Sequence, residues 1–133
     1  MGIFDSLQVS GSALRAERTR MDVIAQNIAN VETTRATGGG AYRRHEVVLR
    51  AQQIGAGGTG VAVAAIVPDE SPLMRIYRPG HPDADGDGYL QMPNVDVSTE
   101  MADMALAARA YEANAAALRS GREMIQTALS ILT

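Results

Sequence analysis

The sequence contains no cysteine and no lysine, since all twelve of its basic side chains are arginine. Without cysteine the chain forms no disulfide, and it cannot supply a thiolate to zinc, to an iron–sulfur cluster or to nucleophilic catalysis. Without lysine it cannot form a Schiff base, and it lacks the residue that completes a Walker-type phosphate loop. The two absences therefore remove several classes of enzyme.

The sequence is also poor in aromatic residues, in histidine and in long apolar runs. Aromatic residues make up 4% of the 133 residues, and the two histidines, His45 and His81, lie far apart. The net charge of −3 offers no bulk attraction to nucleic acid or to an acidic membrane. No run approaches the roughly 18–20 apolar residues that span a bilayer, and residues 1–10 lack the features of a secretory signal peptide. We therefore expect one soluble domain without a cofactor, a metal or membrane insertion.

Glycine and proline are concentrated in the middle of the chain. Of 13 glycines and 5 prolines, only Gly2, Gly11 and Gly121 lie outside the span from Gly38 to Pro93. Because these residues mark turns and break helices, the middle should consist of short pieces, whereas both ends are free to form long helices. Alanine, the best helix former, is dense in the last third of the chain.

The first helix is predicted from about Asp5 to Asn30, by apolar residues that follow a seven-residue repeat. Such a repeat places one apolar seam on one face, as in a coiled coil. Ser10 and Glu17 interrupt the seam, and we interpret Glu17 as a charged group at a wet part of it. The seam residues are Ile3, Leu7, Leu14, Met21, Ile24, Ile28 and Val31.

The second helix is predicted from Val97 to Leu132, with Arg122 interrupting its apolar seam. Asp96 has the residue type that caps a helix N-terminus, and Glu100 suits the positive end of the helix dipole. The methionines of this helix are interpreted as packing residues rather than metal ligands. The seam residues are Val97, Met101, Met104, Ala108, Tyr111, Ala115, Leu118, Ile125, Leu129 and Leu132.

Together these patterns predict an α+β fold. Residues 1–34 and 94–133 form long helices that pair as an antiparallel coiled coil, and residues 35–93 form a small central β-rich segment. Within it, strands are predicted where apolar residues alternate between prolines and glycines. We expect neither helix to have a second apolar layer within the chain, so that the uncovered apolar edge meets other subunits. The predicted strands are residues 43–50, 60–67, 73–78 and 89–92.

Residues 83–94 resemble the start of an EF-hand calcium loop. Carboxylates occupy positions one, three and five, glycine position six and an apolar residue position eight. Position twelve, which must supply a bidentate glutamate, is Asn94, and two prolines exclude a preceding helix. We favour an Asp/Gly turn that leads into a strand. A small calcium-binding module that uses the Asp83–Asp87 loop is the alternative from a different functional class.

No constellation of catalytic residues is evident. Ser6, Ser10 and Ser12 lie on the first helix without a histidine within reach by sequence. The basic patch at residues 42–45 is interpreted as a solvated strand edge or a protein contact. His45 is interpreted as structural or exposed, because no second ligand is evident.

Three segments resemble the bacterial flagellar rod and hook proteins. RMDVIAQNIANVETT (20–34) is similar to the N-terminal signature of this family, and TGGGAYRRHEVV (37–48) is similar to its continuation. RPGHPDADGDGYLQMPNVDV (78–97), followed by ARAYEAN (108–114), resembles the proximal rod members in particular. The resemblance covers essentially the whole chain.

The resemblance implies a structural subunit of the flagellar basal-body proximal rod, and not an enzyme. Members of the family stack helically with other rod proteins around a channel, with their terminal helices paired in the inner tube. The rod spans the periplasm and transmits torque, and its subunits leave the cell through the flagellar type III export apparatus. The resemblance also makes the EF-hand likeness a coincidence. Another rod protein of the same family is the alternative within this class.

We expect assembly to depend on residues of the two seams and on asparagines of the family motifs. Arg122 is expected to pair with Glu17 in the returning helix or with a carboxylate of a neighbouring subunit. The expected assembly residues are Met21, Ile24, Ile28, Asn27, Asn30, Met104, Tyr111, Asn114, Leu118, Arg122, Ile125 and Leu129.

Overall fold

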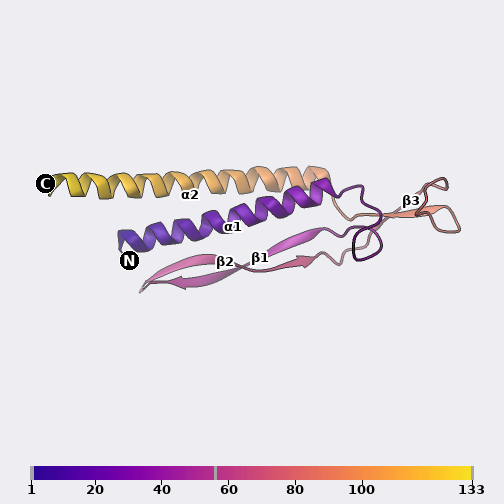
Figure 1. Ribbon diagram of the computed structural model, residues 1–133, viewed down its shortest axis with the longest axis horizontal. Helices are drawn as coiled ribbons and strands as arrows, with labels where there is room; N and C mark the ends of the chain where they lie inside the picture. The colour runs from indigo at the N-terminus through magenta and orange to yellow at the C-terminus, as the bar shows by residue number, and fades with distance from the viewer. Residues whose placement is uncertain (1, 56, 133) are drawn as a thin grey trace.

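Two long helices and a β-hairpin run side by side along the molecule in a computed structural model that describes residues 2–55 and 57–132 (Figure 1). In chain order the elements are α1 (Ile3–Ala29), β1 (His45–Ile54), β2 (Gly58–Pro68), β3 (Met74–Tyr77), β4 (Tyr89–Met92) and α2 (Val97–Ile131). The predicted α+β fold, with a helix at each end of the chain and short antiparallel strands between them, is confirmed. The first strand extends beyond its predicted end to Ile54.

Helices α1 and α2 lie antiparallel, so that both chain ends are at the same end of the molecule (Figure 1). Near this end, a Cβ atom on Gly121 would lie 2.6 Å from Cδ2 of Leu7, so the two helices approach closely there. Asp96 caps α2 as predicted, since its carboxylate accepts a hydrogen bond of 3.2 Å from the Thr99 amide. Among the described residues, no helix is both long enough and apolar enough to cross a membrane.

The seam predicted for α2 is correct at six of its ten positions. Its half-buried members are Met104, Ala108, Tyr111, Ala115, Leu118 and Ile125, whereas Val97, Met101, Leu129 and Leu132 are exposed. Between the correct members, other covered positions hold polar or small residues that an apolar pattern cannot identify. Apolar side chains surround much of α2, so the sequence pattern did not distinguish two adjacent faces. The covered residues that the prediction missed are Glu100, Asp103, Ala107, Ala110, Asn114 and Gly121.

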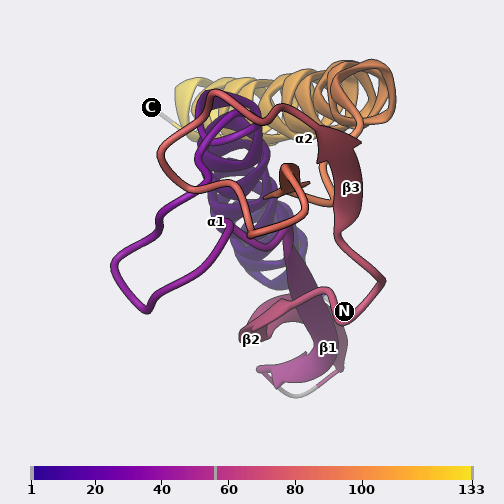
Figure 2. The ribbon, with the colours of Figure 1, turned by 90° about the vertical axis from the view of Figure 1, so that its right-hand side faces the viewer.

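The expectation that neither helix has a second layer within the chain is wrong for α1. Strands β1 and β2 fold back along α1 on the side away from α2 (Figure 2). Ser12, Ala16 and Val23 are buried on α1, and the Ser12 hydroxyl accepts a hydrogen bond of 3.1 Å from the Val61 amide of β2. The small side chains of Ser12 and Ala16 allow the hairpin to pack closely on α1. A pattern of large apolar residues does not identify these positions.

Strands β3 and β4 form a second antiparallel pair beyond the helix ends, joined by residues 78–88 (Figure 1). The rings of Tyr77 and Tyr89 meet edge to face at 5.3 Å, and the Arg75 guanidinium lies 4.2 Å from the Tyr89 ring centre. Gly88 has φ +82°, and a Cβ atom there would lie 2.8 Å from the Tyr77 ring. Glycine is therefore the residue that this turn requires.

Candidate functional site: a polar junction between the helices and the hairpin

The side chain of Asn27 lies at the centre of a buried polar junction where α1 ends and β1 and α2 begin. It is 0% exposed. Its amide nitrogen donates to the His45 carbonyl oxygen (2.9 Å) and to Oε2 of Glu100 (3.0 Å). Its amide oxygen accepts from the Tyr42 hydroxyl and from the His45 amide, both at 2.9 Å. The amide thus makes all four of its possible hydrogen bonds, with partners from residues 42–45 and from α2.

Arg44 supplies the positive charge of the junction. Its Nε donates to Oε1 of Glu100, a side chain that is itself 0% exposed. The same guanidinium is hydrogen-bonded to Glu46 and lies 3.7 Å from carboxylate oxygens of Asp69 and Asp103. Partial burial lowers the pKa of Arg44, but the hydrogen bonds to Glu100 and Glu46 outweigh it and raise the pKa above its ordinary value. Arg44 therefore compensates the fully buried carboxylate of Glu100.

Tyr42 and His45 complete the junction. Burial raises the pKa of the Tyr42 hydroxyl, and the negative charge of Glu100 raises it further, so the hydroxyl stays protonated and donates to Asn27. Nδ1 of His45 lies 3.1 Å from the Tyr42 oxygen, and the two rings are 5.3 Å apart. The interpretation of His45 as structural is confirmed. Of the two interpretations of the patch, a solvated strand edge or a protein contact, the solvated-edge alternative is wrong for Arg44, which forms the junction with Glu100.

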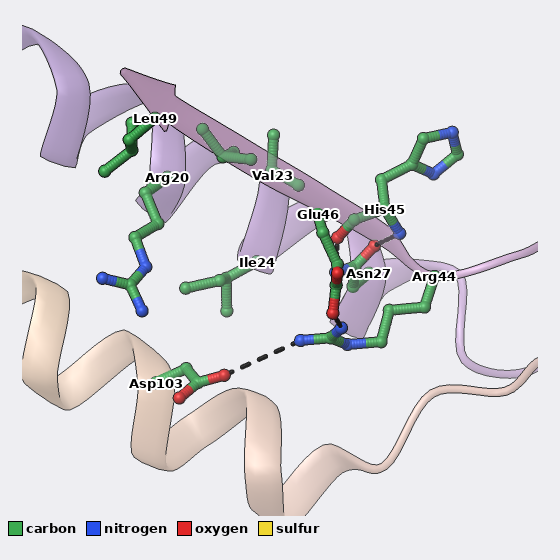
Figure 3. Close-up of a pocket in the computed structure, with 10 residues that line it drawn as sticks. Arg20, Val23, Ile24, Asn27, Arg44, His45, Glu46, Leu49 and Asp103 are labelled. Atoms are coloured by element: carbon green, nitrogen blue, oxygen red, sulfur yellow. Dashed lines mark hydrogen bonds and ion pairs between the residues drawn. The ribbon is translucent and has the colours of Figure 1, made fainter. Parts of the chain in front are cut away.

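An open cleft adjoins the junction between α1, α2 and β1 (Figure 3). Its volume is about 410 Å³. Val23 and Ile24 of α1 form its apolar floor, Leu49 of β1 lines one side, and Asp103 of α2 lines the other. The guanidinium of Arg20 extends into the space between α1 and α2 (Figure 3). The cleft therefore combines an apolar floor with charged groups on its margins.

The structure places the expected assembly residues in three settings. Asn27 is fully buried, whereas Arg122 and Leu129 are exposed on α2. Asn30 and Asn114 each donate to a carbonyl of their own helix, at Gln26 and Ala110 respectively. Ile24 is buried, and the others are half-buried on the two helices, namely Met21, Ile28, Met104, Tyr111, Leu118 and Ile125.

The pairing of Arg122 with Glu17 is not formed within the described chain. Glu17 instead lies 3.9 Å from Arg20 on its own helix, and one of its carboxylate oxygens is buried without a hydrogen bond. Arg122 is exposed on α2. The alternative expectation, a carboxylate of a neighbouring subunit, stays a prediction.

The carboxylates of the Asp-rich loop bind protein groups rather than facing one another. Asp83 accepts from the Thr34 hydroxyl (2.8 Å) and is paired with Arg35. Asp85 accepts from the Tyr89 amide (2.8 Å) and from Arg75 (3.0 Å). Across the described residues, no group of three or more histidines and carboxylates is arranged to hold a metal. The loop is a turn that leads into β4, as the sequence favoured.

Strong acid should weaken this turn. The hydrogen bond from the Tyr89 amide, followed by that from Arg75, lowers the pKa of Asp85 below its ordinary value of 3.8. A lowered pKa in the folded state stabilises the fold above the ordinary value, and this contribution is lost as the pH falls through the folded-state pKa. In an NMR titration we expect the Asp85 carboxyl carbon to titrate with a midpoint below 3.8. The same titration in an Arg75→Met variant should move the midpoint upward, and an unchanged midpoint would contradict the assignment.

Two protein-family models match segments of the chain that contain most of α1 and most of α2. Residues 7–37 match the family model described as flagella basal body rod protein, and residues 87–131 match the one described as flagellar basal body rod FlgEFG protein C-terminal. The chain is 42% identical to the flagellar basal-body rod protein FlgC of Borreliella burgdorferi, over 99% of each chain. It is 42% identical to FlgC of Bacillus subtilis (98% of this chain, 99% of the relative) and 36% identical to FlgC of Salmonella typhimurium (98% of each).

The chain belongs to the FlgC family of flagellar basal-body rod proteins. The resemblance seen in the sequence is thereby confirmed, and the chain is a structural component of the rod. The two matching family models cover most of α1 and α2 but leave out the β1–β2 hairpin. The FlgC relatives, by contrast, align over nearly the full length of the chain.

Proposed function

We propose that this FlgC-family chain is a subunit of the proximal rod, where it assembles helically with other rod proteins and with copies of itself. In this role the assembled subunits form a hollow shaft in the periplasm that transmits torque and conducts exported subunits. The chain itself reaches the rod through the flagellar type III export apparatus. We further propose that α1 and α2 form the coiled-coil inner layer of that shaft.

The observation that carries this proposal is the amount of apolar surface left uncovered on the helix pair. Phe4 is 68% exposed, Met101 62%, Leu129 59% and Leu132 82%. Burying such surface contributes about 25 cal/mol per Å², so helices with open apolar faces gain free energy by packing against neighbours. Contacts of this kind that do not close on themselves build filaments.

The proposed assembly residues contribute in two ways. Arg122 and Leu129 are exposed and are proposed to touch neighbouring subunits directly. Asn27 has no exposed surface, so we propose that it supports assembly by holding α1 and α2 in position. The half-buried seam residues shape the helix pair and present their outer edges to neighbours.

Deletion of the gene tests the proposed function. We expect cells without the gene to be non-motile and to yield basal bodies without a complete rod in electron micrographs, and the wild-type gene in trans should restore both. A deletion strain that still swims and builds a complete rod would overturn the proposal.

Reversing the charge of Arg122 should disrupt incorporation while leaving the monomer folded. Arg122 is exposed, so Arg122→Glu should change the free energy of unfolding by no more than about 0.5 kcal/mol. If the new glutamate faces a carboxylate of a neighbouring subunit, the repulsion between the two negative charges costs several kcal/mol of binding free energy. Binding between the subunits then weakens more than about tenfold. Swimming-plate assays of the complemented deletion strain measure the effect. Arg109→Glu, an exposed position on the same helix, is the matched control, and a fully motile Arg122→Glu strain would refute the assignment.

A further inference from the structure

The last turns of α2 have no partner within the chain. Contact with α1 ends near Gly121 and Ile125, and every residue from 126 to 132 is exposed. Residues 126–132 amount to about 10 Å of helix, and Figure 1 shows that α2 extends past the start of α1. One face of α2, from residue 123 to the free end, carries Met124, Ala128 and Ile131, with Glu123 beside them. The i, i+4, i+7 spacing of the apolar residues is that of a helix that binds in a groove.

The cleft beside the polar junction has an apolar floor that is complementary to the apolar face of the last turns of α2. Its floor of Val23 and Ile24 is apolar, and Leu49 on its side is 38% exposed (Figure 3). It lies between α2 and β1 with α1 beneath it, so side chains of a docked helix that entered it would be contacted from three sides. The space is large enough for several side chains, since its volume is about 410 Å³.

Charges on the two surfaces are also complementary. The Arg20 side chain at the cleft is 39% exposed, and its ion pair in the described chain is with Glu17 at 3.9 Å, near the limit of such contacts. Arg44, by contrast, is already surrounded by four carboxylates. Glu123 on the free end is exposed and forms no ion pair with the described residues. A carboxylate that reached the cleft could therefore form an ion pair with the guanidinium of Arg20.

We propose that the cleft of one copy of this chain receives the free end of α2 of a second copy. Met124 and Ile131 of the second copy pack on Val23, Ile24 and Leu49, and its Glu123 pairs with Arg20. The proposal rests on the rod function proposed above and adds one specific contact to it.

The geometry of this contact favours a filament over a closed dimer. The cleft lies at Asp103 and the free end begins near residue 126, so about 35 Å of α2 separates the two surfaces on one chain. Because different patches of each copy meet, the contact is heterologous and leaves one patch of each kind open for the next copy.

Disulfide cross-linking in the naturally cysteine-free chain tests the contact. Purified Leu49→Cys protein is mixed with purified Met124→Cys protein under mild oxidation, and the disulfide-linked heterodimer is measured on non-reducing gels. We expect a yield several-fold above that of Leu49→Cys mixed with Ala116→Cys, an exposed position on α2 away from both surfaces. A yield equal to that of the control overturns the proposal.

A charge swap supplies the second readout. Arg20→Glu in the first protein or Glu123→Arg in the second should each lower the cross-linking yield about tenfold, since like charges then meet. Mixing the two charge-reversed proteins should restore the yield, because the ion pair re-forms in the opposite sense. Circular dichroism spectra confirm that each protein is folded. Failure of the reversed pair to restore the yield contradicts the Arg20–Glu123 pairing.

Different experimental results would refute the proposed docking contact and the proposed rod function. A deletion strain that still swims and builds a complete rod refutes the rod function. A wild-type gene that restores the rod, together with no specific cross-link, refutes the docking contact alone. In isolated basal bodies, a Leu49→Cys cross-link to a different rod protein, with none between copies, overturns the choice of a second copy as the occupant.

Discussion

Asn27→Leu should lower the free energy of unfolding by about 3–5 kcal/mol, although the two side chains are similar in volume. The substitution removes the donor to Glu100 and the common acceptor for the Tyr42 hydroxyl and the His45 amide. Each buried polar group that loses its partner costs about 1–3 kcal/mol, because no water replaces the lost hydrogen bond. Urea unfolding followed by circular dichroism measures the change.

Asn114→Leu is the matched control for this prediction. Asn114 is half-buried on α2, and its amide nitrogen donates only to Ala110 of its own helix among the described groups. The same chemical change should therefore cost less than about 1 kcal/mol there. If Asn27→Leu proves no more destabilising than Asn114→Leu, the junction is not the stabilising centre that its hydrogen bonds indicate.

Arg44→Met should destabilise the chain by a similar amount for a different reason. The variant keeps an apolar side chain just before β1 but leaves the fully buried Glu100 carboxylate without its cation. Removing one partner of a buried ion pair typically costs about 3–5 kcal/mol. Denaturant unfolding measures the loss, and Arg50→Met, at an exposed position on β1, should stay within about 0.5 kcal/mol of wild type.

A double substitution separates the effect of the unpaired charge from the effect of lost packing. Arg44→Met combined with Glu100→Leu removes both charges, and such replacements of buried pairs are often neutral or stabilising. We expect the double variant to be more stable than Arg44→Met alone. A double variant that is less stable than Arg44→Met would show that the uncompensated carboxylate is not the cause.

The helices and strands were predictable because their signals are local. Asp96 caps α2 through the Thr99 amide three residues away, and Gly88 occupies a turn whose backbone only glycine adopts easily. The confinement of glycine and proline to the middle identified both helices. The four predicted strands correspond to β1–β4 for the same reason, since strand length and boundaries depend on nearby residues.

The junction and the packing of the hairpin were not predictable, because their signals are distant in sequence. Arg44 and Glu100 are 56 residues apart, and each alone resembles an ordinary surface charge. Asn27 has the same residue type as Asn30, yet only Asn27 is fully buried. On α1, the face that meets the hairpin consists partly of Ser12 and Ala16, which no hydrophobic pattern selects. The cleft arises from the meeting of three elements and could not be seen in any of them alone.

The three layers formed by α2, α1 and the hairpin lie side by side along the long axis, and this arrangement has a mechanical consequence (Figure 1). A force along the long axis that pulls on α2 and on the hairpin would slide the three layers past one another, and all contacts between layers would resist it together. A force across the axis would instead peel the layers apart one contact at a time. The subunit should therefore be stiffest under axial shear and weakest under peeling. The polar junction around Arg44 and Asn27 connects the three layers at the end of the molecule where they meet.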